Sequence, residues 1–218
     1  MKKSFIIIGL RRFGASITKT LIEANVDVLA VDINEEAVEA ISKVCPHCAI
    51  ADTTKYDSLL DLGCSNINNA VVAIGNNLQA SILTVVNLKK IGVKNIIVRS
   101  DELSHNEVYA SLGATEIIIP EEASAQSLAN QILSDTIIDF HIIYGDYVMV
   151  KAIVGDDFEP KSLIELDVRN RFNINIVGMI KDDKFFIPKG TDMIEPQVIL
   201  VIAGTKKDIN KFDNFLNK

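Results

Sequence analysis

The chain has 218 residues, of which 48% are hydrophobic, and a net charge of −7. That length allows one large domain or two smaller ones, each with its own core. The negative charge argues against nucleic-acid binding, which needs lysine and arginine to neutralise phosphates. No apolar run approaches the roughly 20 residues that span a bilayer, no signal peptide is evident, and three unevenly spaced cysteines suit a reducing compartment. We therefore expect a cytoplasmic protein without a nucleic-acid partner.

The first two-thirds of the chain alternates between short apolar runs and helical patterns. Strands are predicted near residues 5–9, 27–32, 48–51, 70–75, 95–99 and 116–119. Helices are predicted near residues 14–25, 35–44, 55–62, 78–91, 103–112 and 122–135. Runs that are apolar throughout are typical of parallel strands that are covered on both faces. Short strand–helix alternation with right-handed crossovers predicts an α/β fold, a Rossmann-like doubly wound parallel sheet.

The pattern changes at residue 137. A hairpin that turns at Gly145-Asp146 is followed by a helix near 161–172, by strands near 174–180, 184–187 and 197–203, and by a helix near 206–216. We predict two domains, residues 1–136 with the helix that leaves the sheet, and residues 137–218 as a small α+β module. The second module is too small to be a typical substrate domain of a dehydrogenase.

A nucleotide site is predicted at the first strand-to-helix turn. Gly9 and Gly14 frame this turn, and Asp32 follows the second strand about twenty residues on. In dinucleotide-type folds the glycines let phosphates approach backbone N–H groups at a helix N-terminus, and the acid binds ribose hydroxyls. An acid at this place favours an unmodified 2′-hydroxyl, hence adenosine nucleotides or NAD(H) over NADP(H). The alternative is a tight turn without a ligand.

The residue between those glycines departs from the pattern. Arg11 occupies the position that is normally glycine, so that a backbone can touch pyrophosphate. Its side chain fills space that a phosphate would use, yet it brings a charge-assisted hydrogen-bond donor, and Arg12 brings a second. We expect the steric effect to dominate, so that Arg11→Gly tightens ATP binding several-fold.

Polar side chains also follow the other predicted strands. Asp52 and Thr53 follow the third strand, Gly75, Asn77 and Gln79 follow the fourth, and Arg99 ends the fifth. Ligands bind outside the carboxyl ends of open parallel sheets, near the point where the strand order reverses. Ordinary helix caps would explain some of these residues singly, but the set favours a binding site.

No catalytic centre is evident in the sequence. Cys45-Pro46-His47-Cys48 has the spacing of disulfide oxidoreductases, but it follows a predicted helix instead of opening one, so Cys45 lacks the activation that a helix N-terminus provides. A zinc site would need further ligands, and Cys64, His105 and His141 do not have ligand spacing. We therefore expect a protein that is not an enzyme.

Several motifs together resemble one family. The motifs are Ile6 to Gly14, Val31 to Glu35, Val72 to Ser81, Gly113 to Glu116, Pro120-Glu121, Leu163 to Arg169 and Asn175 to Val177. They look like the RCK family, regulators of potassium conductance, and most resemble the soluble gating subunits of bacterial Ktr/Trk-type potassium uptake systems. The resemblance covers almost the whole chain, as an RCK N-lobe followed by an RCK C-lobe.

The resemblance implies partners and ligands. It implies a homodimer that assembles into a homo-octameric ring on the cytoplasmic side of an integral-membrane potassium-translocating subunit. The N-lobe would bind ATP or ADP, or in some members NAD(H), with a divalent or sodium cation that Glu121 helps to place beside the phosphates. Asp32 would hold the ribose, Asp52 and Thr53 would lie near the adenine, and Arg12 would reach a terminal phosphate across the dimer. Paired C-lobes would bind cyclic di-AMP.

The implied binding residues fall into two sets. The nucleotide set is Gly9, Arg11, Arg12, Phe13, Gly14, Asp32, Asn34, Asp52, Thr53, Ile74, Gly75, Asn77, Gln79, Arg99 and Glu121. The cyclic di-AMP set is Leu163, Ile164, Asp167, Val168, Arg169, Asn175, Ile176 and Pro188, the last shifted by one residue. The apolar members of the second set could instead be the core of a small module. Two other functions remain as alternatives, an NAD-dependent oxidoreductase and a free-standing nucleotide sensor without a membrane partner.

Overall fold

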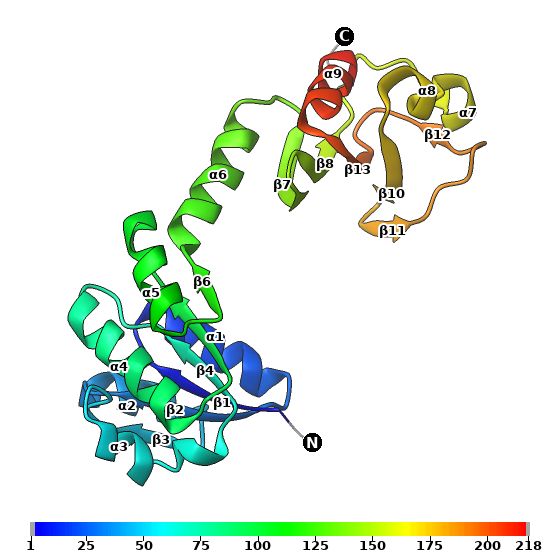
Figure 1. Cartoon of the computed structure of the whole chain (residues 1–218). Helices are drawn as coiled ribbons and strands as arrows, with labels where there is room; N and C mark the ends of the chain where they lie inside the picture. The colour runs from blue at the N-terminus through cyan, green and yellow to red at the C-terminus, as the bar shows by residue number, and fades with distance from the viewer. Residues whose placement is uncertain (1–2, 217–218) are drawn as a thin grey trace. The chain divides into compact units, whose positions relative to one another are not determined.

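The computed structural model describes residues 3–216, and the chain divides into two compact units, up to Glu121 and from Glu122 onward. Figure 1 shows a first unit of alternating strands and helices, and a second unit that ends with the C-terminal helix. Within residues 3–216, every helix is too short or too polar to span a membrane. The second unit begins just inside the helix that the sequence assigned to the first domain, fifteen residues before the predicted boundary at 136.

The first unit contains a six-stranded parallel sheet. Its strands, in spatial order, are β3 (Cys48–Ile50), β2 (Asp27–Asp32), β1 (Ser4–Ile8), β4 (Asn69–Val72), β5 (Asn95–Arg99) and β6 (Glu116–Ile118). Its helices are α1 (Arg12–Glu23), α2 (Glu35–Ser42), α3 (Tyr56–Asp61), α4 (Leu78–Ile91) and α5 (Asn106–Leu112), with short 3₁₀ turns at Cys64–Asn66 and Leu103–His105. The predicted Rossmann-like sheet is confirmed, and the strand order reverses between β1 and β4.

Alternating side chains of β1 enter two separate cores, one on each face of this sheet. Ile6 and Ile8 pack with residues of α3, α4 and α5, whereas Ile7 packs with residues of α1 and α2. All three isoleucines are almost fully buried. Because both faces are covered, the strands read as continuous apolar runs, and the carboxyl ends of β1, β2 and β4 are left as the place where polar side chains can meet.

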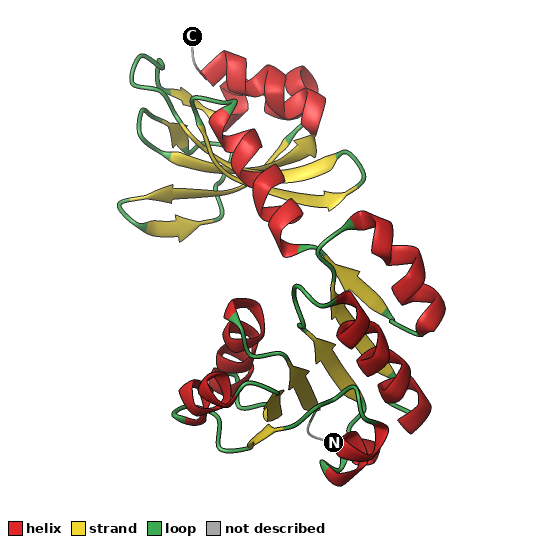
Figure 2. Ribbon diagram, turned by 90° about the vertical axis from the view of Figure 1, so that its left-hand side faces the viewer, coloured by secondary structure: helices red, strands yellow, loops and turns green. Residues whose placement is uncertain are grey.

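The second unit is built on a five-stranded antiparallel sheet. Its strands, in spatial order, are β11 (Lys184–Phe186), β10 (Asn175–Lys181), β13 (Ile199–Thr205), β8 (Tyr147–Ile153) and β7 (Ile137–Tyr144), and β9 (Lys161–Ser162) pairs separately with β12 (Met193–Ile194). Its helices are α7 (Leu163–Leu166), α8 (Val168–Phe172) and α9 (Lys206–Leu216), together with most of α6 (Pro120–Ile132). Figure 2 shows helices and sheet strands of this unit packed against one another, as the predicted α+β module requires.

The single helix predicted over 161–172 is wrong. Residues 161–162 form a strand, and α7 and α8 are separated by Asp167, whose φ of +43° lies in the left-handed region. A capping box starts α7, in which the side chains of Ser162 and Glu165 each accept a hydrogen bond from the other's backbone N–H group. Asp167 ends the helix after one turn. The pairing of β9 with β12 was not predicted, because two-residue strands carry no periodic signal.

Candidate functional site

The turn after β1 needs glycine at two positions and not at the third. Gly9 has a φ of +93°, and a Cβ there would lie 2.8 Å from the backbone of Ala73. A Cβ on Gly14 would lie 1.8 Å from the carbonyl oxygen of Gly9. Arg11, in contrast, has φ −67° and ψ −168°, which is extended backbone open to any residue. The close approach of α1 to β1 is therefore kept. Arg11 adds a charged side chain to the cavity lining without straining the turn.

The Asp32 carboxylate is held at the carboxyl end of β2 by two backbone amides. Leu10 N donates to Oδ2 at 2.5 Å and Asn34 N donates to Oδ1 at 2.9 Å. A carboxylate offers about four lone-pair sites, so each oxygen of Asp32 can still accept one more hydrogen bond. The chain thus presents a fixed, charged double acceptor beside the glycine turn.

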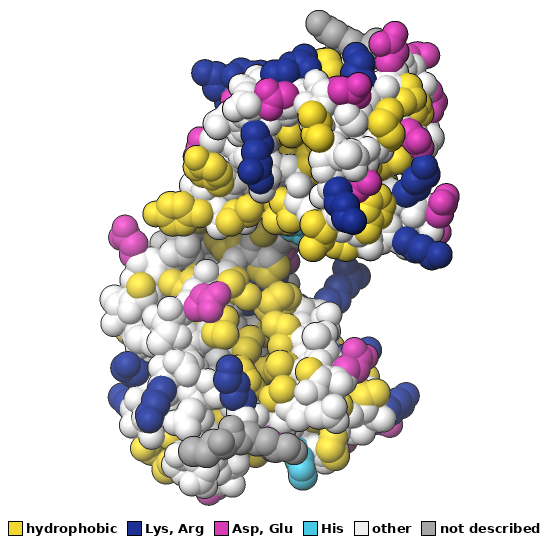
Figure 3. Space-filling model, turned by 90° about the vertical axis from the view of Figure 1, so that its right-hand side faces the viewer, with side chains coloured by type: hydrophobic (Ala, Val, Ile, Leu, Met, Phe, Trp, Pro, Cys, Tyr) yellow, Lys and Arg dark blue, Asp and Glu magenta, His cyan; other side chains and the backbone are white. Residues whose placement is uncertain are grey.

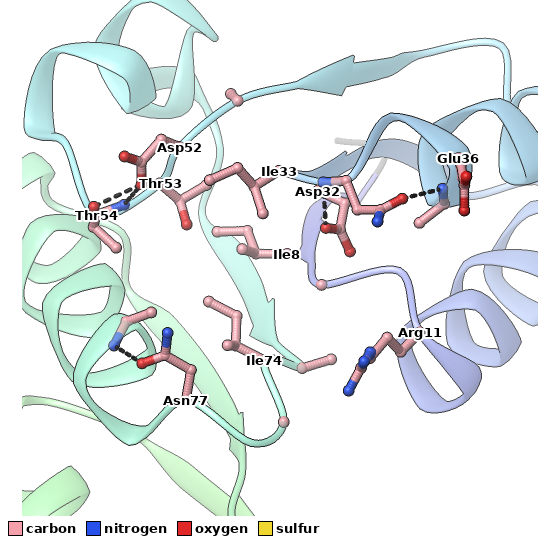
Figure 4. A pocket seen from close by; sticks show the side chains of 17 residues that line it. Ile8, Arg11, Asp32, Ile33, Glu36, Asp52, Thr53, Thr54, Ile74 and Asn77 are labelled. Atoms are coloured by element: carbon pink, nitrogen blue, oxygen red, sulfur yellow. Dashed lines mark hydrogen bonds between the residues drawn. The ribbon is translucent and has the colours of Figure 1, made fainter.

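These residues border a cavity of about 760 Å³ at the carboxyl ends of the strands. Of the predicted nucleotide set, the lining includes Gly9, Arg11, Asp32, Asn34, Asp52, Thr53, Ile74, Gly75 and Asn77. Figure 4 shows the Arg11 guanidinium extending from the start of α1 into the space in front of Ile74, while Asp32 ends β2 and Asp52 lies in the segment after the neighbouring β3. The structure therefore brings most of the predicted set to one concave surface.

Six members of the predicted nucleotide set lie outside that lining. Gly14 is buried beneath the turn, and Phe13 is half-buried on α1. Arg12 and Gln79 are exposed in the first turns of α1 and α4. Arg99 and Glu121 form an ion pair beyond the cavity wall.

The predicted nucleotide set leaves out several residues that line the cavity. They are Ile8, Ile33, Glu36, Ala37, Ala51, Thr54, Ala73 and Ala80. Ile33 is 69% exposed although it is a large apolar residue directly after Asp32. An isoleucine directly after Asp32, at the end of a buried strand, could have been recognised in the sequence as an apolar residue of the cavity. Ala37 and Ala80 donate their backbone N–H groups to the caps Asn34 and Asn77, at 3.0 and 2.9 Å.

Buried polar groups on α4 fix the segment that follows β3. The Thr53 and Thr84 hydroxyls are 2.9 Å apart, and Thr53 is 5% exposed. Asn87 Nδ2 donates to the carbonyl oxygen of Thr54 at 2.9 Å. The Thr54 hydroxyl donates to Asp52 Oδ1 at 2.6 Å, and this bond is the main reason that the pKa of Asp52 is lowered. Asp52 is therefore a charged, oriented group on the cavity wall.

Arg99 ties the far wall of the cavity to the start of α6. Its Nη1 lies 3.0 Å from Asp101 Oδ1, and its Nη2 donates to Glu121 Oε1 at 2.6 Å. A Cβ on Gly75 would lie 2.5 Å from Nη1, so the guanidinium rests against the bare backbone of that glycine. Asp101 Oδ2 in turn accepts from Asn76 N at 3.1 Å. Arg99 and Gly75 thus act in the packing of the β4–α4 turn.

Among the described residues, the nearest partner of the Glu121 carboxylate is a cationic side chain. The carboxylate is bound by Arg99, which is also the main cause of its lowered pKa. In residues 3–216, no three His, Cys, Asp or Glu side chains come together to hold a metal. A cation at Glu121 remains a prediction.

Cys45, the first cysteine of the CxxC motif, and Cys64 have the environment of packing residues. Cys45 is buried beneath α2, with its Sγ 3.1 Å from the carbonyl oxygen of His47, and burial raises its pKa. Burial also raises the pKa of Cys64 to about 11. A raised pKa keeps a thiol protonated and unreactive at neutral pH.

The predicted cyclic di-AMP set divides into exposed and packed residues. Ile164, Asp167, Arg169 and Asn175 are exposed, whereas Val168 is buried and Leu163, Ile176 and Pro188 are half-buried. Arg169 Nε and Nη2 both donate to Asn175 Oδ1, at 3.1 and 2.8 Å. The face of the second unit in Figure 3 carries hydrophobic side chains among lysines and arginines. Exposed apolar residues of α7, β12 and the region around β11 are Ile164, Phe185, Phe186, Ile187 and Met193.

Two domain families match the chain. The TrkA-N domain matches residues 5–120, and the TrkA-C domain matches residues 148–217. The chain therefore belongs to the RCK family of potassium regulatory proteins, which combine these two domains.

Within that family, the chain is similar to proteins of the Ktr type. It is 38% identical over 213 residues to the Ktr system potassium uptake protein A of Bacillus subtilis (strain 168), covering 97% of this chain and 96% of the relative. It is 36% identical over 214 residues to the Ktr system potassium uptake protein C of the same organism, covering 98% and 97%. The crystal structure of the GsuK RCK domain superposes with a TM-score of 0.70 at 16% identity, over 100% of this chain and 48% of that one. At that identity the likeness shows the fold alone.

Proposed function

We propose that this chain is the regulatory subunit of a Ktr-type potassium uptake system and binds an adenine nucleotide in its first unit. The names of the relatives, each matched over almost its full length, support the potassium system. In this proposal the chain is cytoplasmic and attached to the inner face of the membrane through a potassium-translocating partner. It forms homodimers that assemble into a homo-octameric ring, and exchange of ATP for ADP changes the ring.

The observation that carries the nucleotide proposal is the restrained carboxylate of Asp32. It lies at the wall of a cavity of about 760 Å³ and is fixed by hydrogen bonds from Leu10 N and Asn34 N. Each of its oxygens can still accept one more hydrogen bond. Two adjacent ribose hydroxyls are donors that match two adjacent carboxylate oxygens. A 2′-phosphate at that place would instead bring two negative charges against a third, which costs free energy at short range. Apolar side chains at 33 and 74 offer contact to the adenine.

Calorimetric titration with ATP, ADP, NADH and NADPH tests this proposal. We expect ATP and ADP to bind without turnover, and NADPH to bind most weakly of the four because its 2′-phosphate meets Asp32. Tight NADPH binding, or steady hydride transfer to any acceptor, would contradict it. The lining of the cavity, within the described residues, contains no histidine, lysine, serine or cysteine, which disfavours the oxidoreductase alternative.

We further propose cyclic di-AMP as the ligand of the second unit. The exposed apolar side chain of Ile164 lies on α7. Arg169 on α8, the next helix along the chain, presents a planar cation whose Nε and Nη2 both donate to Asn175 Oδ1. A purine needs an apolar surface, and a phosphate needs such a planar donor. Because the ligand has two-fold symmetry, two copies of the unit would bind it across a two-fold axis. Co-purification with a membrane protein would separate the whole proposal from a free-standing sensor.

A further inference from the structure

The nucleotide cavity has an uneven distribution of charge. Its lining includes three carboxylates, on Asp32, Glu36 and Asp52, and, within the described residues, a single cationic side chain, Arg11. Arg11 is exposed and makes no ion pair or hydrogen bond through its guanidinium to any residue from 3 to 216. A charged side chain without a partner inside a concave surface is free to bind an anionic ligand group.

Arg11 stands where a dinucleotide would pass. In dinucleotide-type folds the pyrophosphate crosses the glycine turn at the N-terminus of the first helix, and the second nucleoside continues beyond it. Here the backbone at residue 11 is extended, so the turn keeps its shape, but the side chain extends into the cavity in front of the turn (Figure 4). The flanking Gly9 and Gly14 are fixed by backbone contacts, so the turn cannot move aside to make room.

We propose that Arg11 selects the ligand by length and charge, favouring adenosine mononucleotides with terminal phosphates over dinucleotides. This inference rests on the proposed adenine-nucleotide site. A triphosphate carries several negative charges that end near the guanidinium, and it has nothing beyond them to accommodate. NADH carries only its pyrophosphate charges, followed by an uncharged nucleoside that would have to occupy the space of Arg11.

Two substitutions separate the bulk of this side chain from its charge. Arg11→Gly removes both, so NADH should tighten at least tenfold while ATP tightens several-fold, and the preference for ATP should fall. Arg11→Met keeps most of the bulk without the charge, so NADH should stay as weak as in the wild type and ATP should weaken severalfold. Lys19→Met, at an exposed position on the same helix, is the matched control and should change neither affinity.

The measurement is calorimetric titration of the full-length wild type and the three variants with ATP and with NADH, alongside the melting temperature without ligand. Melting temperatures close to that of the wild type are expected, because residue 11 has an extended backbone and its side chain has no partner in the described chain. If the wild type binds ATP and NADH equally, or if Arg11→Gly leaves their ratio unchanged, the inference is overturned while the nucleotide site stands. If neither the wild type nor Arg11→Gly binds any adenine nucleotide, the proposed function fails and this inference fails with it.

Discussion

At the scale of single residues, the proposed choice between a free 2′-hydroxyl and a 2′-phosphate depends on one carboxylate, that of Asp32. Asp32 accepts hydrogen bonds from two backbone amides and lines the cavity, so in our proposal the same carboxylate fixes the turn and binds the ribose. The sequence located this residue from its place after an apolar strand, because strand and acid are close in the chain. The exposure of Ile33, and the lack of a partner for the Arg11 guanidinium among residues 3–216, depend on how distant segments fold, so the structure was needed to see them.

Asp32→Asn should reduce the discrimination between NADH and NADPH. The amide removes the negative charge that repels a 2′-phosphate, and it replaces one acceptor with a donor. We expect ATP to bind about tenfold more weakly, which is about 1.4 kcal/mol, and the NADPH to NADH ratio of dissociation constants to move toward one. Titration calorimetry measures both.

Asp52→Asn is the control for this prediction. It removes one negative charge from the same cavity, at the end of a different strand, and should leave that ratio unchanged. An unchanged ratio in Asp32→Asn, or an equal change in both variants, would show that Asp32 does not face the 2′-position.

At the scale of elements, the start of α9 depends on one carboxylate. Asp208 accepts hydrogen bonds from Asn173 Nδ2 at 3.0 Å, from the Thr205 hydroxyl at 2.8 Å and from Lys211 Nζ at 3.1 Å. These bonds, that from Asn173 first, lower its pKa to about 2. Asn173 is in the left-handed region with φ +56°, so the same carboxylate also fixes the end of α8.

This arrangement gives a pH-dependent stability with a definite sign. The folded pKa lies below the unfolded value of about 3.9, so the stabilisation is complete above that value and is lost as the pH falls toward about 2. Asp208→Asn should melt several degrees below the wild type at pH 7, and the difference should shrink as the pH falls below 4. Thermal melts followed by circular dichroism test this. Asp157→Asn, at an exposed position, is the control and should have the melting temperature of the wild type at either pH. If the melting temperature of Asp208→Asn is still below that of the wild type at pH 2, the charge of the carboxylate is not the cause.

The two-lobed order of elements could be predicted from the sequence, but its details in the second unit could not. Apolar runs and the spacing of apolar residues in helices are local features of the sequence. They correctly predicted the six parallel strands and the helices between them. The break at Asp167 and the β9–β12 pair depend on a left-handed residue and on contacts between distant segments, which have no local period. For the same reason the predicted site set mixed cavity residues with residues such as Gly14 and Arg99, which hold the turns in place.

At the scale of the whole molecule, the second unit has a core of its own. Every buried residue of that core lies between Ile137 and Leu216. A fragment of residues 137–218 should therefore fold, form a dimer and bind one cyclic di-AMP per dimer. Arg169→Ala should weaken that binding at least tenfold and leave the ligand-free melting temperature nearly unchanged, because Arg169 is exposed.

Sedimentation and calorimetry of this fragment measure the dimer and the stoichiometry. Lys184→Ala, which also removes an exposed cation of the second unit, is the control and should bind normally. A monomeric fragment, or one whose affinity does not depend on Arg169, would mean that the residues of this set serve only the packing of the unit.

We propose that nucleotide exchange in this chain regulates potassium movement through a membrane partner. The most direct measurement is rubidium uptake into proteoliposomes that contain a Ktr-type membrane subunit, with this chain added in the presence of ATP or of ADP. We expect uptake to depend on the chain and to be faster with ATP than with ADP, with no consumption of either nucleotide. Uptake at the same rate without the chain would contradict this regulation. So would uptake at the same rate with ATP and with ADP when both nucleotides bind to the chain.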